Sequence, residues 1–177
     1  MSNRACAVGE VSLAEIMRYT PHRYPLLQID RGREFEPFQR MVGIKNVSIN
    51  EPWSRGCPPG QEYYPDLLVL EAMGQTGGVM MSKSLGANLE GVTLAFIAMD
   101  NVRFLRRARP GDVLCLPVSV TKYRENFFKF HAEAYINDRL AAECDFTGVA
   151  MATPLSPQPA PPTVPAHWQS NLQRDPQ

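Results

Sequence analysis

The sequence has no excess of charge of either sign. Lys and Arg together number 18, and Asp and Glu also number 18, in a chain of 177 residues. This balance argues against a protein that binds nucleic acid through bulk charge, because such a protein needs a strongly basic surface. A net charge near zero also makes self-association easier. The length suggests one domain whose core needs no disulfide or metal.

Long apolar runs are also missing. The longest, Val92 to Met99, has the length of a strand, whereas a helix that crosses a bilayer needs about 20 apolar residues. Residues 1–11 lack the apolar core of a secretory signal. We therefore expect a cytoplasmic protein without a membrane span.

The four cysteines form no CxxC pair and show no zinc spacing. Three of them, Cys6, Cys115 and Cys144, are expected to be small core or surface residues in a reducing compartment. The fourth, Cys57, lies in a loop rich in Pro and Gly at residues 51–60. We expect no metal site, and the sequence contains no nucleotide-binding fingerprint.

Proline marks the end of the folded domain. Seven of the 16 prolines follow Ala152, in a stretch with no helical or strand period. Such a composition is typical of an extended, polyproline-like segment. We therefore expect a domain at residues 10–151 and a Pro-rich tail at residues 152–177.

The pattern within the domain predicts two helices. Ser12 and Glu15 form a capping-box pattern, so a short helix begins there and ends before Pro21. Pro65 and Asp66 open a longer helix that is apolar almost all round and therefore buried. Three glycines in this helix, Gly74, Gly77 and Gly78, indicate that other groups pack close to its backbone.

Strand patterns precede and follow this long helix. The predicted strands are residues 26–30, 33–38, 41–48, 92–105, 113–123, 127–136 and 140–151. The last four are joined by short turns, which implies antiparallel neighbours. A buried helix enclosed by an antiparallel sheet is an α+β arrangement.

Several motifs in this order resemble the bacterial 3-hydroxyacyl-acyl-carrier-protein dehydratases of the hot-dog fold. They are PHRYPLL (21–27), DR (30–31), IKNVSINEP (44–52), GCPPG (56–60), PDLLVLEAMGQ (65–75), DNVRF (100–104) and PGD (110–112). The resemblance runs from about residue 12 to residue 150 and is more specific for fold than for activity. It implies one long helix wrapped by a curved antiparallel sheet, and two protomers that pair their sheets edge to edge.

The resemblance also implies an active site between two protomers. In the family, a His in the loop before the helix removes the proton next to the thioester, and a carboxylate on the partner's helix protonates the departing hydroxyl. Glu71 stands at the carboxylate position and Cys57 at the His position. We expect Glu71 to be buried, with a pKa raised by burial. A simple buried, hydrogen-bonded Glu is the alternative.

Cys57 is the departure that matters most for activity. A free thiol is only about 3% thiolate at neutral pH, so it is a poor general base. A self-paired dimer would then be a very weak dehydratase. An inert space-filling residue is one interpretation of Cys57, and a nucleophile that forms an acyl-enzyme is another.

Asp66 is a second departure, because the family has Gly there and uses its N–H to hold the thioester oxygen. The Asp side chain either lies beside the developing negative charge or folds back as the helix cap. Glu62 and Tyr64 also replace residues that are usually apolar. The resemblance further places Tyr24, Pro58 and Leu67 at the acyl tunnel or its gate, although Tyr24 is equally well explained as a packed aromatic.

The remaining candidates are basic side chains. Arg103, Arg106, Arg107 and Arg109 form a dense cluster. This cluster is either a solvated surface or a docking site for an acidic carrier protein and its phosphopantetheine, since arginine suits phosphate. His22 is interpreted as structural, and His131 as a hydrogen-bonded sheet residue.

These observations leave three hypotheses for a protein that handles acyl thioesters on acyl carrier protein, in fatty-acid, lipid or polyketide synthesis. It is one subunit of a dehydratase that pairs with a His-bearing homologue, or a self-sufficient enzyme. A self-sufficient enzyme would be a slow dehydratase or a thioesterase in which Glu71 activates water. The third hypothesis is a non-catalytic acyl-binding or regulatory protein. No cofactor is expected beyond the phosphopantetheine that the substrate carries.

Overall fold

The computed structural model describes residues 9–86, 92–124 and 126–152. Cys6 and all of the predicted tail (residues 152–177) except Ala152 lie outside these described residues, and Ala152 is the last residue of the final strand. The first helix, α1, spans Leu13–Tyr19. Its start is the predicted capping box: the Ser12 hydroxyl accepts the Glu15 N–H, and the Glu15 carboxylate accepts the Ser12 N–H. The helix ends at Thr20, before Pro21, as predicted.

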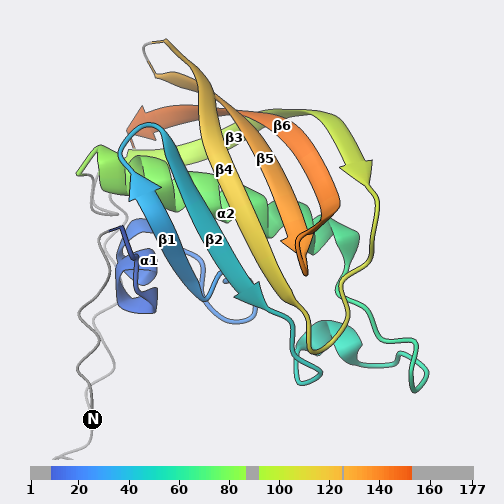
Figure 1. Cartoon of the computed structure of the whole chain (residues 1–177). Coiled ribbons are helices and arrows are strands. Elements are labelled where there is room, and N and C mark those ends of the chain that lie inside the picture. Colours follow the sequence, from blue (N-terminus) through green and yellow to red (C-terminus); the bar gives the residue numbers. More distant parts are fainter. Residues whose placement is uncertain (1–8, 87–91, 125, 153–177) are drawn as a thin grey trace, which may run out of the picture.

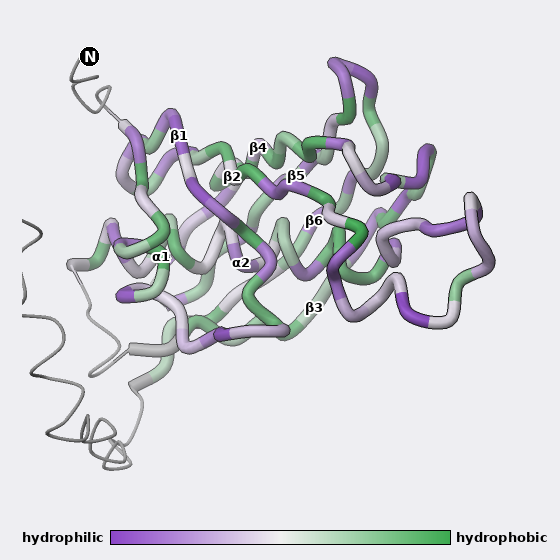
Figure 2. The backbone as a smooth tube through the Cα atoms, turned by 90° about the horizontal axis from the view of Figure 1, so that it is seen from below, coloured by the Kyte–Doolittle hydropathy of each residue, from purple (hydrophilic) through white to green (hydrophobic). Residues whose placement is uncertain are grey.

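The described strands form one antiparallel sheet of six strands in the order β1-β2-β4-β5-β6-β3. Their bounds are β1 Arg31–Glu36, β2 Arg40–Asn46, β3 Val92–Phe104, β4 Val113–Arg124, β5 Phe127–Ile136 and β6 Arg139–Ala152. Buried residues alternate with half-buried or exposed ones along β5 and the first half of β4, as expected for strands with one face on a core. Figure 2 shows both hydrophobic and hydrophilic residues along the strands of the sheet. The four strands predicted from residue 92 onward are confirmed.

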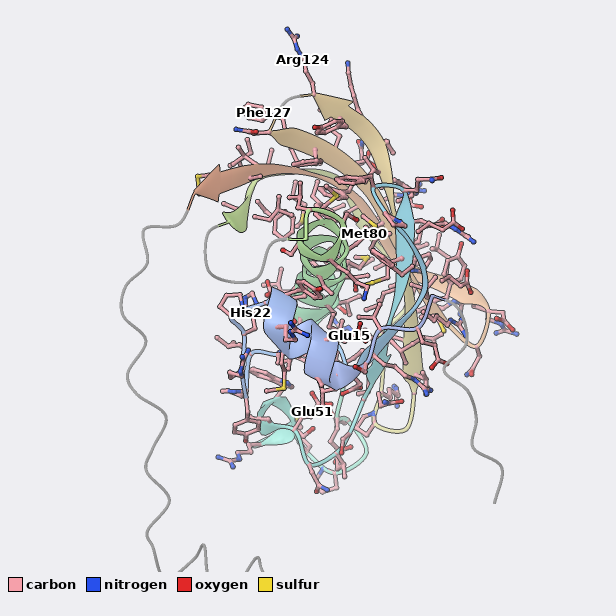
Figure 3. All side chains as sticks on the ribbon, turned by 90° about the vertical axis from the view of Figure 1, so that its left-hand side faces the viewer. Glu15, His22, Glu51, Met80, Arg124 and Phe127 are labelled. Atoms are coloured by element: carbon pink, nitrogen blue, oxygen red, sulfur yellow. The ribbon has the colours of Figure 1, made fainter. Side chains whose placement is uncertain are left out.

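The long helix α2 spans Asp66–Ser84 and lies against the inner face of the sheet, which curves around it (Figures 1 and 3). Most of its residues from Val69 to Ser82 are buried. Phe130 and Phe146 of the sheet stack on each other and pack beneath it, with ring centroids 4.7 Å apart. The predicted α+β arrangement, one buried helix wrapped by an antiparallel sheet, is confirmed.

Small residues let the helix and the sheet approach each other closely. A Cβ at Gly74 would lie 3.0 Å from the Phe96 ring, and one at Gly77 would lie 3.0 Å from the Phe146 ring. A Cβ at Gly43 on β2 would overlap the Thr76 side chain. The predicted close packing is therefore confirmed at Gly74 and Gly77. It is wrong for Gly78, where a Cβ would meet no atom of another element within 4 Å.

The prediction of a strand at residues 26–30 is wrong. Part of this segment bonds to a side chain instead of a neighbouring strand: the Leu26 carbonyl accepts the Gln75 amide, and the Gln28 N–H donates to the Gln75 carbonyl oxygen. The segment first bonds to β2 at Asp30, whose backbone N–H donates to the carbonyl oxygen of Ile44. The strand predicted at residues 33–38 is β1, which starts at Arg31 and ends at Glu36, before a turn at residues 37–39.

Candidate functional site

A cavity of about 200 Å³ lies where α2, β3 and the segment after α1 meet. Leu94 and Phe96 of β3 give it an apolar wall, and Gly74 and Gly78 of α2 leave room in it. Its polar side chains come from two distant parts of the sequence. The lining residues are Tyr19, Thr20, Pro21, His22, Glu71, Gly74, Gln75, Gly78, Ser82, Leu94 and Phe96.

Glu71 occupies the first half of α2, and a neighbour on the same helix face fixes its side chain. Gln75 lies four residues further on, so it shares that face, and its Nε2 donates to Glu71 Oε1 at 2.7 Å. The Glu71 side chain is 43% exposed. The expectation of a buried carboxylate is therefore wrong for the single chain, because Glu71 opens onto the cavity instead of facing the core.

His22 faces Glu71 across the polar side of the cavity. Its Nε2 lies 3.5 Å from Glu71 Oε1, and its Nδ1 lies 2.5 Å from Thr20 Oγ1. The segment that carries it follows α1, on the side where the helix meets α2 (Figure 3). His22 was interpreted as structural from the sequence alone, but the structure makes it a neighbour of the candidate catalytic carboxylate.

The hydrogen-bond network behind His22 and Glu71 was not predicted from the sequence. Tyr64 is 2% exposed, and its hydroxyl donates to Gln28 Oε1 at 2.6 Å. Burial raises the pKa of Tyr64, so the hydroxyl stays protonated and remains a donor. The backbone N–H of Gln28 donates to Gln75 Oε1, and Gln75 Nε2 in turn donates to Glu71 Oε1. The spacing of Glu71 and Gln75 is a sequence signal for their contact, whereas the Tyr64–Gln28 contact had none.

Cys57 lies in the loop between β2 and α2, after a short 3-10 turn at Pro52–Ser54. It is half-buried, and its Sγ lies 3.8 Å from the Trp53 carbonyl oxygen. It does not line the cavity that holds Glu71. In the described part of this single chain, Cys57 and Glu71 are therefore not brought together, as expected for a site shared between protomers.

Asp66 is the first residue of α2, and Pro65 occupies the cap position without a side-chain hydrogen bond. The prediction that Asp66 folds back as the helix cap is therefore wrong. Its carboxylate lies 3.8 Å from Arg107 Nε, and the Arg107 guanidinium packs over the Tyr63 ring, 4.8 Å from its centroid. This pair partly offsets the negative charge that Asp66 brings to the start of the helix.

The predicted tunnel residues lie on the surface of the single chain. Tyr24 is 79% exposed, Leu67 is 73% exposed and Pro58 is also exposed. None of the three lines the cavity described above. Their assignment to a tunnel or gate stays a prediction that needs a second protomer.

The four arginines fall into two pairs. Arg103 forms an ion pair with Glu143 on β6, and Arg107 forms the pair with Asp66. Arg106 and Arg109 are exposed and make no side-chain ion pair with any residue that the structure describes. Only this second pair keeps its full charge available for a partner.

The other titratable candidates lie outside this site. His131 on β5 bonds through Nδ1 to Asp145 Oδ1 at 2.8 Å, as predicted for a hydrogen-bonded sheet residue. Cys144 is buried in the core, and burial raises its pKa to about 12, with a smaller effect of Asp145.

The described residues show no metal site and no membrane helix. Within residues 9–86, 92–124 and 126–152, no group of three or more His, Cys, Asp or Glu side chains is placed to hold a metal ion. No helix in those ranges is long and apolar enough to cross a membrane.

Comparison with known proteins identifies the family. Residues 20–145 match the FabA-like domain family. The chain is 45% identical to the 3-hydroxyacyl-[acyl-carrier-protein] dehydratase FabZ of Caulobacter sp. (strain K31) over 147 residues, which cover 83% of this chain and 90% of that protein. It is 43% identical to the FabZ of Syntrophobacter fumaroxidans over 135 residues, 76% of this chain and 90% of that one.

The fold is shared with solved structures at low sequence identity. The dehydratase heterocomplex ApeI:P from Xenorhabdus doucetiae superposes with a TM-score of 0.64 at 17% identity, covering 77% of this chain and 90% of that one. A hot-dog-like protein from Thermanaerovibrio acidaminovorans gives a TM-score of 0.55 at 20% identity, over 67% and 85% of the two chains. With the hot-dog architecture in place and identities above 40% to dehydratases over most of its length, this chain belongs to the FabA-like family, among relatives of the FabZ type.

Proposed function

We propose that this protein dehydrates 3-hydroxyacyl thioesters carried by acyl carrier protein, with Glu71 protonating the departing 3-hydroxyl. The observation that carries the proposal is the position of Glu71, hydrogen-bonded by Gln75 at the mouth of a partly apolar cavity. A carboxylic acid held in a fixed orientation is the group that general acid catalysis requires. The relatives named as FabZ dehydratases support the same reaction.

The cavity suits the region around the thioester better than a whole acyl chain. Its volume of about 200 Å³ is small compared with the pockets of drug-sized ligands, which measure roughly 300–1,000 Å³. Phe96 and Leu94 line it on β3, whereas the exposed Tyr24 and Leu67 lie outside it. A longer acyl chain would therefore extend past the cavity, along a surface that a second protomer completes.

The edge of the sheet supports pairing of two protomers. β3 is an end strand of the sheet and carries several half-exposed apolar side chains: Phe96, Ile97, Met99, Val102 and Phe104. An uncovered edge of this kind is prone to pair with another strand. We propose that β3 pairs with β3 of a second copy or of a homologue, which would bring the partner's 51–60 loop toward Glu71.

The experiment uses the purified full-length chain with 3-hydroxybutyryl- and 3-hydroxydecanoyl-acyl carrier protein, and mass spectrometry detects the loss of water. Glu71→Gln keeps the shape and the contact to Gln75 but removes the titrating proton. We expect it to lower kcat by a factor of roughly 10²–10⁴. An exposed control, Glu10→Gln, should leave kcat unchanged.

The same assay separates the other functions. Release of the free acid in place of the enoyl product would contradict dehydration and indicate a thioesterase. Binding of the acyl carrier protein without turnover would indicate a non-catalytic acyl-binding protein. A Glu71→Gln variant with the full dehydration rate would show that Glu71 is not the acid.

A heterodimer with a His-bearing homologue is the second candidate, favoured by Cys57 at the position of the family's His. A dehydratase from Xenorhabdus doucetiae is a heterocomplex and shares this fold. Co-expression with such a homologue should yield a complex whose activity depends on the partner's loop His and on this chain's Glu71. An equally active complex after loss of that His would contradict the heterodimer hypothesis.

A further inference from the structure

His22 is the histidine that the structure places next to Glu71. The sequence has three histidines. His131 lies on β5 and is bonded to Asp145, and His167 lies outside the described residues. His22 alone of the two described histidines lines the cavity, and its Nε2 lies 3.5 Å from Glu71 Oε1.

The backbone that carries His22 is held firmly, unlike that of an incidental surface histidine. The Arg23 guanidinium donates to three carbonyl oxygens around it: those of Met17 at 2.9 Å, Thr20 at 2.9 Å and His22 at 2.7 Å. These bonds close the turn after α1 and fix where the imidazole emerges. A side chain fixed by its own surroundings costs little reorganisation when a reaction uses it.

The contacts of His22 are compatible with the tautomer that a general base needs. The Thr20 hydroxyl oxygen lies 2.5 Å from His22 Nδ1, and it also accepts the His22 backbone N–H at 3.5 Å. The Thr20 hydroxyl oxygen can accept a hydrogen bond from an Nδ1–H, and this is the tautomer that the proposal uses. The lone pair of Nε2 then points to the cavity, which is the state that a general base needs. Thr20 is thus a positioning residue for His22.

We propose that His22 is the general base of this site and removes the proton next to the thioester, in place of the loop His that Cys57 replaces. The proposal rests on the dehydration proposed above. It differs from the family geometry in taking base and acid from one chain. Cys57 is a poor base at neutral pH and does not line this cavity.

His22 and Glu71 together account for every proton that moves in this step. Neutral His22 takes the proton from C2 of the acyl group, and the electron pair of that C–H bond forms the C2–C3 double bond. The C3–O bond breaks, and the oxygen leaves as water with the proton of Glu71. His22 then returns its proton to the Glu71 carboxylate, which lies 3.5 Å away. Base and acid this close can serve neighbouring carbons on one face of the substrate.

Three variants of the full chain test the proposal with 3-hydroxybutyryl-acyl carrier protein as the probe. His22→Asn keeps an amide near the Nδ1 position, and His22→Gln keeps one near the Nε2 position, but neither can accept the proton. We expect each to lower kcat by roughly 10²–10⁴-fold with KM changed by less than about threefold. His131→Asn is the matched control and should keep the wild-type kcat, because His131 lies on β5 and does not line the cavity. Because the His22 side chain is 36% exposed, both His22 variants should fold, which circular dichroism checks.

Each outcome decides the proposal. A low kcat in both His22 variants, with a normal KM and an active His131→Asn protein, supports it. A normal kcat in His22→Asn and His22→Gln beside an inactive Glu71→Gln would overturn it and leave the proposed function intact. A wild-type chain that dehydrates nothing on its own would also overturn it. In that case, activity regained with a His-bearing homologue would preserve the role of Glu71, and no activity in any combination would remove the proposed function too.

Discussion

The cavity around Glu71 and the loop that carries Cys57 differ in how the chain holds them. At the cavity, side chains from α2 and from the segment after α1 fix one another: Gln75 bonds to Glu71, Leu26 and Gln28. The loop is held mainly near its base, where Glu51 accepts from Lys45 and from the Ser48 N–H and where Trp53 packs against the core.

The tip of the loop has much less support from its own chain. Gly56 and Gly60 adopt positive φ angles of 81° and 80°, and a Cβ at either would meet nothing within 4 Å. Most residues from 55 to 61 are exposed. Chemistry at the cavity can therefore be organised by one chain, whereas chemistry at the loop tip would need the second protomer proposed above.

The largest expected effect comes from breaking the base of the loop. Lys45 is 7% exposed, bonds to Glu51 at 2.9 Å and lies over the Tyr64 ring. Lys45→Met leaves the Glu51 carboxylate without its cationic partner in a partly buried place, so we expect the free energy of unfolding to fall by about 3 kcal/mol. Urea denaturation measures this change in the free energy of unfolding.

Lys122→Met, which removes an exposed lysine, is the control for this variant and should change the free energy of unfolding little. The double variant Lys45→Met/Glu51→Met should recover part of the loss, because no charge is then left unpaired. Wild-type stability in Lys45→Met would show that this ion pair does not hold the loop.

The next effect comes from breaking the cavity network without touching the loop. Gln75→Leu leaves the Leu26 carbonyl and the Gln28 N–H without partners and releases Glu71. Because unsatisfied buried groups cost about 1–3 kcal/mol each, we expect a loss of about 2 kcal/mol in unfolding free energy. The kcat for dehydration should fall as well.

Denaturant unfolding and the dehydration assay together check this variant. Gln61→Leu on the exposed loop is its matched control and should change neither quantity. If Gln75→Leu lost stability but kept full activity, the orientation of Glu71 by Gln75 would not matter to the reaction.

A smaller effect concerns the ion pair that joins α1 to α2. The Lys83 ammonium bonds to the Glu15 carboxylate at 2.6 Å, and this contact, with the Ser12 N–H, lowers the pKa of Glu15 from 4.5 to about 2. A lowered pKa stabilises the fold above the unfolded value of 4.5, and the contribution is lost as pH falls toward 2. Because the pair is partly exposed, we expect about 1 kcal/mol.

The measurement compares wild type with Lys83→Met by urea denaturation at several pH values. The difference in unfolding free energy should be full near pH 6 and shrink as pH falls below about 4.5. Arg18→Met, which removes an exposed cation from α1, controls for general charge effects. A difference that did not change with pH would mean that Lys83 acts through packing on Tyr19 and Phe35 alone.

The smallest expected effect lies on the surface. If Arg106 and Arg109 meet an acidic carrier protein, Arg106→Glu/Arg109→Glu should weaken binding several-fold at low salt and flatten its salt dependence. Isothermal titration with acyl carrier protein measures this. Arg18→Glu/Arg124→Glu, with the same charge change elsewhere, should bind normally. Equal affinity of both double variants would make the arginine cluster an ordinary solvated surface.

Patterns that repeat over a few residues predicted the elements of this fold well. The capping box at Ser12 and the Pro65–Asp66 helix start lie where expected, and so do the four strands after residue 92. Residues 26–30 failed because their partner is the side chain of Gln75, which no local pattern reveals. Tyr64, a departure from the family pattern, is a buried donor to Gln28.

The sequence by itself determined the architecture and the candidate acid, since apolar periodicity, capping residues and the motif around Glu71 act over short range and can be recognised in one chain. Only the tertiary structure decided which groups meet. His22 reaches Glu71 because Arg23 closes the turn after α1 and that turn packs against α2. Cys57 stays away from the cavity because its loop leads outward from β2. Contacts between distant segments depend on how helix and sheet pack, and a list of residues does not contain that geometry.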